Sequence, residues 1–422
     1  MHALHSVHAE TGEDHDVDKN VDIGTNNRTD IRTDIRAADT PQACAAPLSL
    51  DALIAEIERR RDEFDTLSHI PRDMIAQMKR AGIFRAGTPQ RFGGDALAPH
   101  RFLAILERIA IADGSTAWVA AFGSANTYLA ALPVETQAQI YASGPDQVFA
   151  GGLYPPQRGE RAPGGFRVSG QWHFASGCKG ADWIGVGIGG APGAPGEPNA
   201  GKPFTAVFPA REVEIVENWN VVGMQGTGSH DLRLKDKFVD ERWTFLRGST
   251  AVIDEPLYRY PAVSYQAQVH AAVNLGLARA ALDVLTGLSG VTATTTGAPR
   301  LADRAYYRAG LAQAEASLRS ARAFFFESVE AAWDAILAGD AVSIEQANLL
   351  RLSATHAAHA CAEVVMNAYK MAGIGAIYRE GRMQRLVRDS IVVTQHGFLG
   401  EGTYDAAGAV FAGIAPVVTP YP

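Results

Sequence analysis

The stretch Gln171–Asp182, QWHFASGCKGAD, decides how the rest of the chain is interpreted. Large and small residues alternate through Trp172 and Phe174 and stop at Gly177, a pattern that predicts a strand ending in a tight turn. Such a strand end offers an aromatic wall, a backbone edge and the hydroxyl of Ser176. That set suits the face of a flat heteroaromatic ligand better than a phosphate or a metal ion. An aromatic-rich strand end is more often plain core, so the interpretation depends on the surrounding sequence.

Length and composition predict a soluble globular protein of two or three packed units. The chain has 422 residues, 47% of them hydrophobic and 20% charged. Its net charge of -8 and the lack of basic runs with interleaved aromatics argue against nucleic-acid binding. Three widely spaced cysteines, Cys44, Cys178 and Cys361, indicate neither a disulfide framework nor a zinc site. No apolar run has membrane-spanning length and no signal peptide is evident, so we expect a cytoplasmic protein without membrane contact.

The order of patterns along the chain predicts a disordered tail followed by three domains. Residues 1–46 are polar, and their histidines match no standard metal site, so we expect a disordered N-terminal tail and no metal. Residues 47–146 form an all-helical domain, in which Leu50, Leu53 and Ile57 share the face of a helix that begins at Ser49. A second helix begins near Pro71.

The middle domain, residues 147–258, consists of short β-type runs between glycine and proline punctuation. We expect strands at 166–168, 171–174, 183–186, 204–208 and 232–239, and a flexible surface loop at 187–203. These strands predict a β-sandwich or a small barrel.

The C-terminal domain, residues 259–422, has long alanine-rich helical patterns. Helices are expected at 263–288, 301–337, about 343–371 and about 382–393, and Ser343–Gln346 has the form of a capping box. This predicts a four-helix bundle whose faces associate with other copies of the chain.

Three common functional signals are either absent or lack the context that they need. Gly185–Gly190 matches G-x-G-x-x-G, but a proline-rich stretch follows where a dinucleotide fingerprint needs a helix. The chain contains no G-x-S-x-G, so the commonest serine-hydrolase signal is missing. His356 and His359 share a helix face without the E-x-x-H that a di-iron bundle requires.

The domain order and three local motifs resemble the acyl-CoA dehydrogenase-like flavin-dependent monooxygenases. The motifs are Trp172–Gly177, Trp219–Asp231 (WNVVGMQGTGSHD) and Gln384–Asp389 followed by His396. The resemblance covers about residues 48–400 and implies the α+β acyl-CoA dehydrogenase fold, with a helical domain, a middle β domain and a C-terminal four-helix bundle. It also implies an oxygenase component that receives reduced flavin, FADH2 or FMNH2, from a separate NAD(P)H:flavin reductase, and a homotetramer. The resemblance further implies that the product is an oxygenated aromatic, heteroaromatic or polyketide-like molecule, formed with O2 by way of a C4a-hydroperoxyflavin.

An acyl-CoA dehydrogenase is the alternative, and it needs a carboxylate base. The positions at which that family has its glutamate correspond here to Gly397 and, by ungapped comparison, to a residue near Gln266. Neither is a carboxylate. Glu401 is close enough that an error of alignment could restore the base, so the dehydrogenase hypothesis stays open at this point.

The resemblance also assigns roles to single residues in the flavin site. It places Ser176 beside flavin N5, and Phe174 and Trp118 against the ring, with core packing nearly as good an explanation for Trp118. Thr227 and Ser229 supply further polar contacts to the flavin.

His396, with an ordinary pKa of about 6.5, would hold or relay a proton near neutral pH. The alternative is a histidine that caps the C-terminus of a helix.

The sequence departs from the family at the substrate and adenine ends. Phenol-hydroxylating relatives have a histidine where this chain has 124–126 (SAN) and a serine where it has 151–153 (GGL), so hydroxylation of a simple phenol is doubtful. Asn126, Tyr128 and Tyr154 are candidate substrate contacts. The sequence of 369–373, YKMAG, replaces a Q-x-x-G-G, which leaves FAD and FMN both open.

Overall fold

The computed structural model describes residues 46–189, 203–290 and 299–414. Residues 1–45 of the expected tail and most of the expected loop at 187–203 lie outside the described residues. Within the described part, no helix has the length and apolarity that crossing a bilayer requires. The same residues contain no cluster of three or more potential metal ligands of the His, Cys, Asp and Glu types.

The first described segment is helical, as predicted. Its helices are α1 (Leu50–Leu67), α2 (Arg72–Arg80), α3 (Pro99–Ala112), α4 (Gly114–Ala120), α5 (Asn126–Leu129) and α6 (Val134–Ile140). The Ser49 hydroxyl accepts a hydrogen bond from the Ala52 N–H and caps α1. A 3-10 turn at 121–123 separates α4 from α5. The break redirects the chain at the point where α4 ends beside the candidate site.

The strands form one continuous hydrogen-bonded sheet with the order β5-β6-β2-β1-β3-β4-β7. They are β1 (Phe149–Ala162), β2 (Gly165–Ala175), β3 (Trp183–Gly189), β4 (Phe204–Pro209), β5 (Glu214–Val216), β6 (His230–Asp240) and β7 (Thr244–Leu246). Among the strand pairs of the described residues, only β1–β3 is parallel. This refines the expectation of a sandwich or small barrel to a single seven-stranded sheet. The G-x-G part of the rejected dinucleotide motif lies inside β3, which supports its rejection.

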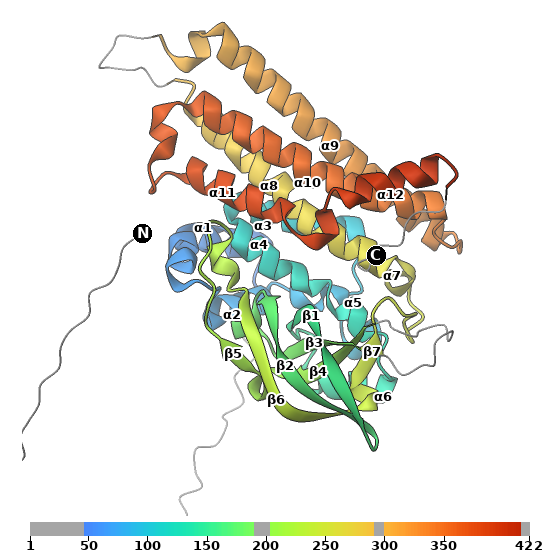
Figure 1. Ribbon diagram of the computed structural model, residues 1–422. Helices are drawn as coiled ribbons and strands as arrows, with labels where there is room; N and C mark the ends of the chain where they lie inside the picture. Colours follow the sequence, from blue (N-terminus) through green and yellow to red (C-terminus); the bar gives the residue numbers. More distant parts are fainter. Residues whose placement is uncertain (1–45, 190–202, 291–298, 415–422) are drawn as a thin grey trace, which may run out of the picture. The chain divides into compact units, whose positions relative to one another are not determined.

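The C-terminal segment contains α7 (Pro256–Arg259), α8 (Ala262–Gly287), α9 (Ala305–Leu337), α10 (Ile344–Ala372), α11 (Arg382–Thr394) and α12 (Gly402–Phe411). The predicted capping box is confirmed: the Ser343 hydroxyl and the Gln346 side chain cap each other's backbone N–H groups. Helix α8 is buried on most of its circumference because it packs on α10 and α11 on one side and on α3 and α4 on the other. Figure 1 shows α3 and α4 between the long helices and the strands. The division into three domains stays a prediction.

Candidate active site

Two adjoining cavities lie where α4, the end of β2 and the end of α11 meet. The outer cavity has a volume of about 1380 Å³ and the inner one of about 680 Å³, counting the space at their openings to solvent. They share the side chains of Trp118, Phe174, Ser176, Arg247 and His396 among others. The outer cavity continues toward Trp219 and Ser229, and the inner one toward Tyr128 and His270. None of the described residues that line either cavity is an aspartate or a glutamate.

Phe174 forms an exposed aromatic face at the end of β2. Its backbone has a φ of 62°, a left-handed conformation that a bulky residue rarely adopts. The β2–β6 register shifts between Trp172 and Ala175, and this bulge turns Phe174 out of the sheet. The side chain is 63% exposed, and its ring meets the edge of Trp219 at a centroid distance of 6.5 Å. Backbone strain of this kind concentrates at functional sites, so Phe174 is well suited to face a flat ligand.

A row of three hydroxyl groups runs along the outer cavity. Ser176 Oγ lies 2.6 Å from Ser229 Oγ, which lies 2.7 Å from Thr227 Oγ1. Thr227 donates to the carbonyl oxygen of Met224 at 2.8 Å, and Trp118 Nε1 donates to Ser176 Oγ at 3.2 Å.

Each hydroxyl has only one proton, so the two ends of the row fix its direction. The proton of Thr227 is used on Met224, hence Ser229 donates to Thr227 and Ser176 donates to Ser229. Ser176 therefore presents only a lone pair to the cavity.

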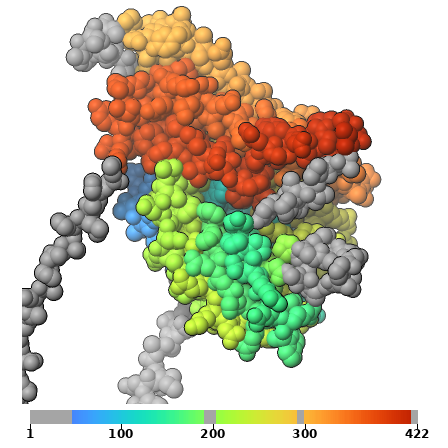
Figure 2. Space-filling view, viewed as in Figure 1, coloured from blue at the N-terminus to red at the C-terminus, as the bar shows by residue number. Residues whose placement is uncertain are grey.

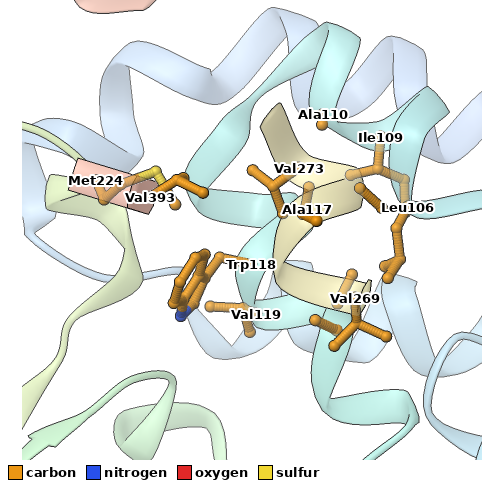
Figure 3. Close-up of a cluster of buried hydrophobic side chains, with 14 of the residues drawn as sticks. Leu106, Ile109, Ala110, Ala117, Trp118, Val119, Met224, Val269, Val273 and Val393 are labelled. Atoms are coloured by element: carbon orange, nitrogen blue, oxygen red, sulfur yellow. The ribbon is translucent and has the colours of Figure 1, made fainter. Parts of the chain in front are cut away.

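Trp118 joins this row to the buried core. It projects from α4, and Figure 3 shows its ring beside Val119 with Leu106 and Ile109 on the far side of the cluster. Asp113 caps α4 by accepting from the backbone N–H of Thr116 at 2.7 Å. Its other oxygen accepts from Arg385 Nη2 at 2.7 Å. The helix that carries Trp118 is thus tied to α11 at its first turn.

The segment that bears the hydroxyls is tied to α11 as well. Asp389 Oδ1 accepts from the backbone N–H of Met224 at 2.5 Å, and Arg388 Nη1 donates to the carbonyl of Val222 at 2.7 Å. A Cβ atom at Gly223 would lie 2.4 Å from the carbonyl oxygen of Arg388, so only glycine permits this approach. The 219–231 and 384–389 motifs are therefore in direct contact in the folded protein.

Two stacked histidines form the boundary between the cavities. The rings of His270 and His396 have a centroid distance of 4.3 Å and an interplanar angle of 23°. Burial lowers the pKa of His270 to about 4. Burial, followed by the nearby His270 and Arg247, lowers the pKa of His396 well below its usual value. Both rings are therefore neutral near pH 7, so the pKa of His396 lies below the ordinary value of about 6.5 used in the sequence argument. Its role in holding or relaying a proton stays a prediction.

Most of the sequence-predicted residues do line the cavities. Both cavities are lined by Trp118, Phe174, Ser176 and His396, the outer one alone by Tyr154, Thr227 and Ser229, and the inner one by Tyr128. Which of them contact flavin or substrate stays a prediction.

Asn126 is the exception, because it lines neither cavity. Its buried amide donates to the carbonyl oxygens of Phe84, at 2.8 Å, and Gln147, at 3.2 Å. It therefore holds the surrounding loops together, and its role as a substrate contact stays a prediction that neither cavity supports.

Sequence reasoning missed His270 and Arg247. His270 is one residue in the middle of a buried alanine-rich helix, and no spacing rule distinguishes it from core. Arg247 follows the last strand in a segment without a motif, yet it lines both cavities and lies 5.7 Å from the ring centre of Tyr128. Each is found only when distant segments are brought together.

The positions of a dehydrogenase base contain no acid. Gln266 lines the inner cavity with a neutral amide that donates to Ser124 Oγ at 3.1 Å. Gly397 lines the outer cavity and has no side chain. Glu401 is exposed at the start of α12, and it is not among the residues that line either cavity. A carboxylate poised to remove a substrate proton is therefore missing from these cavities.

Comparison with known proteins agrees with the fold and the site. Residues 51–142 match the acyl-CoA dehydrogenase N-terminal domain family and residues 268–401 match the acyl-CoA dehydrogenase C-terminal domain family. The chain is 49% identical over 387 residues to an indole-3-acetate monooxygenase of Pseudomonas putida, covering 90% of this chain and 97% of that protein. It is 32% identical over 269 residues to the oxygenase component of an FADH2-dependent resorcinol hydroxylase of Rhizobium sp. (strain MTP-10005), covering 60% of this chain and 64% of that protein. The crystal structure of 3-HSA hydroxylase from Rhodococcus sp. RHA1 is similar with a TM-score of 0.81 at 24% identity, covering 88% and 98% of the two chains.

These matches and the acid-free cavities define a flavin-dependent monooxygenase built on the acyl-CoA dehydrogenase fold. Such an enzyme uses reduced flavin and O2 to oxygenate aromatic or heteroaromatic molecules. The chain belongs to the acyl-CoA dehydrogenase-like flavin-dependent monooxygenases, as an oxygenase component. The fold class expected from the sequence is confirmed.

Proposed function

We propose that this enzyme oxygenates a bicyclic aromatic acid of the indole-3-acetate type. The observation that carries the proposal is the inner cavity, which combines the rings of Phe122, Phe149 and Phe245 with the guanidinium of Arg247. Aromatic walls suit a flat ring system, and a guanidinium suits a carboxylate. The relative at 49% identity is named for indole-3-acetate.

The outer cavity fits a reduced flavin by the chemistry of its lining. Phe174 and Trp118 offer ring faces, and Ser176 offers an acceptor for a ring N–H group. When bound there, the reduced flavin supplies the electrons that activate O2. His396 and Phe398 line both cavities, so they would separate the two ligands and limit the entry of water.

The proposal also covers the identity of the flavin, the protein that supplies it and the assembly of the enzyme. The flavin is FADH2, in line with the name of the Rhizobium relative, and a separate NAD(P)H:flavin reductase supplies it. The described residues contain no strand-to-helix dinucleotide motif with which this chain could bind NAD(P)H itself.

The assembly is a homotetramer formed through the C-terminal helices. Helix α12, red at the right of Figure 2, lies at the surface, and its Phe411 is 64% exposed.

A single-turnover experiment with isotopic oxygen tests the activity. The enzyme is mixed with chemically reduced FAD and indole-3-acetate, and then with ¹⁸O2. One labelled atom is expected in the product and the other in water, with both electrons taken from the reduced flavin. Unchanged indole-3-acetate, with all the oxygen recovered as hydrogen peroxide, would refute the proposal.

The dehydrogenase alternative receives no support from the cavities. Abstraction of an α-proton needs a base in contact with the substrate, and the described lining has no carboxylate. Adding an acyl-CoA without O2 to the enzyme loaded with oxidised FAD should therefore give no bleaching of the bound flavin.

A further inference from the structure

Three side chains that line the inner cavity, Tyr128, Thr205 and His270, have an acceptor atom without a hydrogen-bond partner among the described residues. The two hydroxyls also carry a proton of their own, so each can donate as well as accept. The cavity is mostly apolar, and its polar groups are few. Gln266 is engaged with Ser124, and Ser176 with the hydroxyl row. His270 lines the inner cavity but not the outer one. His270 would therefore contact the substrate in the inner cavity and not the flavin in the outer one.

The hydrogen bonds of His270 fix which of its nitrogens carries the proton. Its Nδ1 lies 2.5 Å from the carbonyl oxygen of Gln266. A carbonyl oxygen only accepts, so Nδ1 must be the N–H donor. The buried ring is neutral near pH 7, since its pKa is about 4, and it has no second proton. Nε2 of His270 is therefore a lone-pair acceptor.

That acceptor is open to the cavity. None of the described residues hydrogen-bonds to Nε2, and this atom is not among the buried polar atoms that are sealed from solvent without a partner. The ring packs against Trp118, at a centroid distance of 4.2 Å, and against His396, at 4.3 Å, and the Nδ1 hydrogen bond to Gln266 restrains its orientation. Nε2 is thus held in place before any substrate arrives.

The proton of His396 is on the other ring nitrogen from that of His270. Its Nδ1 accepts from the backbone N–H of Phe398 at 3.3 Å, so the proton of the neutral ring is on Nε2. The stacked pair presents one acceptor and one donor. His396 lines both cavities, whereas the acceptor of His270 belongs to the inner cavity alone.

We propose that His270 selects substrates with a ring N–H, by accepting a hydrogen bond from that group. The inference rests on the proposed function and narrows its substrate class to bicyclic aromatic acids that carry an N–H donor, such as indoles. A site built around a hydrogen bond rejects the analogue that lacks the donor, because its own polar group is then left unpaired. His270 is accordingly a specificity residue in contact with substrate.

The test compares ligands of one shape with and without the donor. Dissociation constants are measured anaerobically, on the enzyme loaded with reduced FAD, for indole-3-acetate and for benzofuran-3-acetate, in which oxygen replaces N–H. The wild-type enzyme should bind the indole about tenfold or more tightly than the benzofuran. In His270→Phe, which keeps a stacked ring without an acceptor, the ratio should fall to about one. His356→Phe, an exposed histidine of α10, is the matched control and should keep the wild-type ratio.

Equal affinities in the wild-type enzyme, or an unchanged ratio in His270→Phe, would overturn the inference. The wild-type comparison decides the matter alone if His270→Phe does not fold. Indole and benzofuran without the acid chain are measured alongside. A preference for N–H without oxygenation of indole-3-acetate overturns the proposed function only, and oxygenation without that preference overturns the role of His270 only. Binding of none of the four ligands overturns both.

Discussion

Replacing Ser229 by alanine should weaken the ability of the enzyme to distinguish reduced from oxidised flavin. In the wild-type protein the proton of Ser176 is used on Ser229, so Ser176 offers the outer cavity a lone pair only. Reduced flavin carries N–H groups where oxidised flavin has bare ring nitrogens, and an acceptor favours the former. Ser229→Ala releases the proton of Ser176, which can then donate to the oxidised ring.

The size of the effect follows from the one hydrogen bond that changes partner. A hydrogen bond of this kind contributes about 1 kcal/mol net, and that is about a fivefold change in a binding constant. We expect the affinity for oxidised FAD to rise by this factor and the affinity for reduced FAD to change little. Thr227→Val should act in the same direction, because Ser229 loses its acceptor and is free to donate to Ser176 instead.

The assay is a pair of titrations, with oxidised FAD in air and with dithionite-reduced FAD under argon, each followed by protein fluorescence. Thr227→Ser is the matched control, since it retains the hydroxyl and the direction of the row. A ratio of the two dissociation constants that stays at the wild-type value in both Ser229→Ala and Thr227→Val would refute the assignment of proton direction.

Three further changes give separate tests. The folded pKa of His270 is about 4 and its ordinary value is 6.5, so the unfolded chain binds a proton first as the pH falls. Protonation of the unfolded chain removes up to about 3 kcal/mol of the free energy of unfolding between about pH 6.5 and 4. Urea unfolding of His270→Gln should therefore show a shallower loss of stability on acidification than the wild-type protein shows. Asp113→Ala should lower the free energy of unfolding by about 2 kcal/mol in the same assay, because α4 loses its cap and Arg385 loses a buried partner. A free energy of unfolding equal to that of the wild-type protein would contradict this. Glu401→Gln should change the free energy of unfolding by less than about 0.5 kcal/mol and leave the single-turnover yield of oxygenated product intact, whereas a lost yield would show that Glu401 takes part in the reaction.

Helix positions were predictable because their signals are local. The face formed by Leu53 and Ile57 is buried, and the capping box at Ser343 forms as expected. Strand β1, at 149–162, was not predicted, since its glycines and the pair Pro155 and Pro156 mark a loop in ordinary sequence patterns. Helix α12 was missed as well. Its pattern is short and mixed, and a single buried residue, Ala407, anchors it.

The site was predictable only where its residues sit in compact motifs. Ser176, Ser229 and His396 fall in such motifs, and the structure brings them to adjoining cavities. The direction of the hydroxyl row was beyond sequence reasoning, because it depends on Trp118 and Met224 at its two ends. The partners of Asn126 were beyond sequence reasoning for the same reason. A side-chain amide beside a site can hydrogen-bond either to a ligand or to the backbone of a loop, and only the folded structure shows which.

The distribution of acids around the cavities explains why oxygenation replaces dehydrogenation on this fold. Carboxylates are present nearby, but Asp113 caps α4 and Asp389 holds the backbone of Met224, and neither lines a cavity. Apart from the guanidinium of Arg247, what faces the ligands is a set of neutral donors and acceptors. Such groups can orient a ring and its N–H without charge, yet none of the described ones can keep a proton taken from an unactivated carbon. A substrate held there needs a partner that attacks its electron-rich ring, and activated oxygen is such a partner.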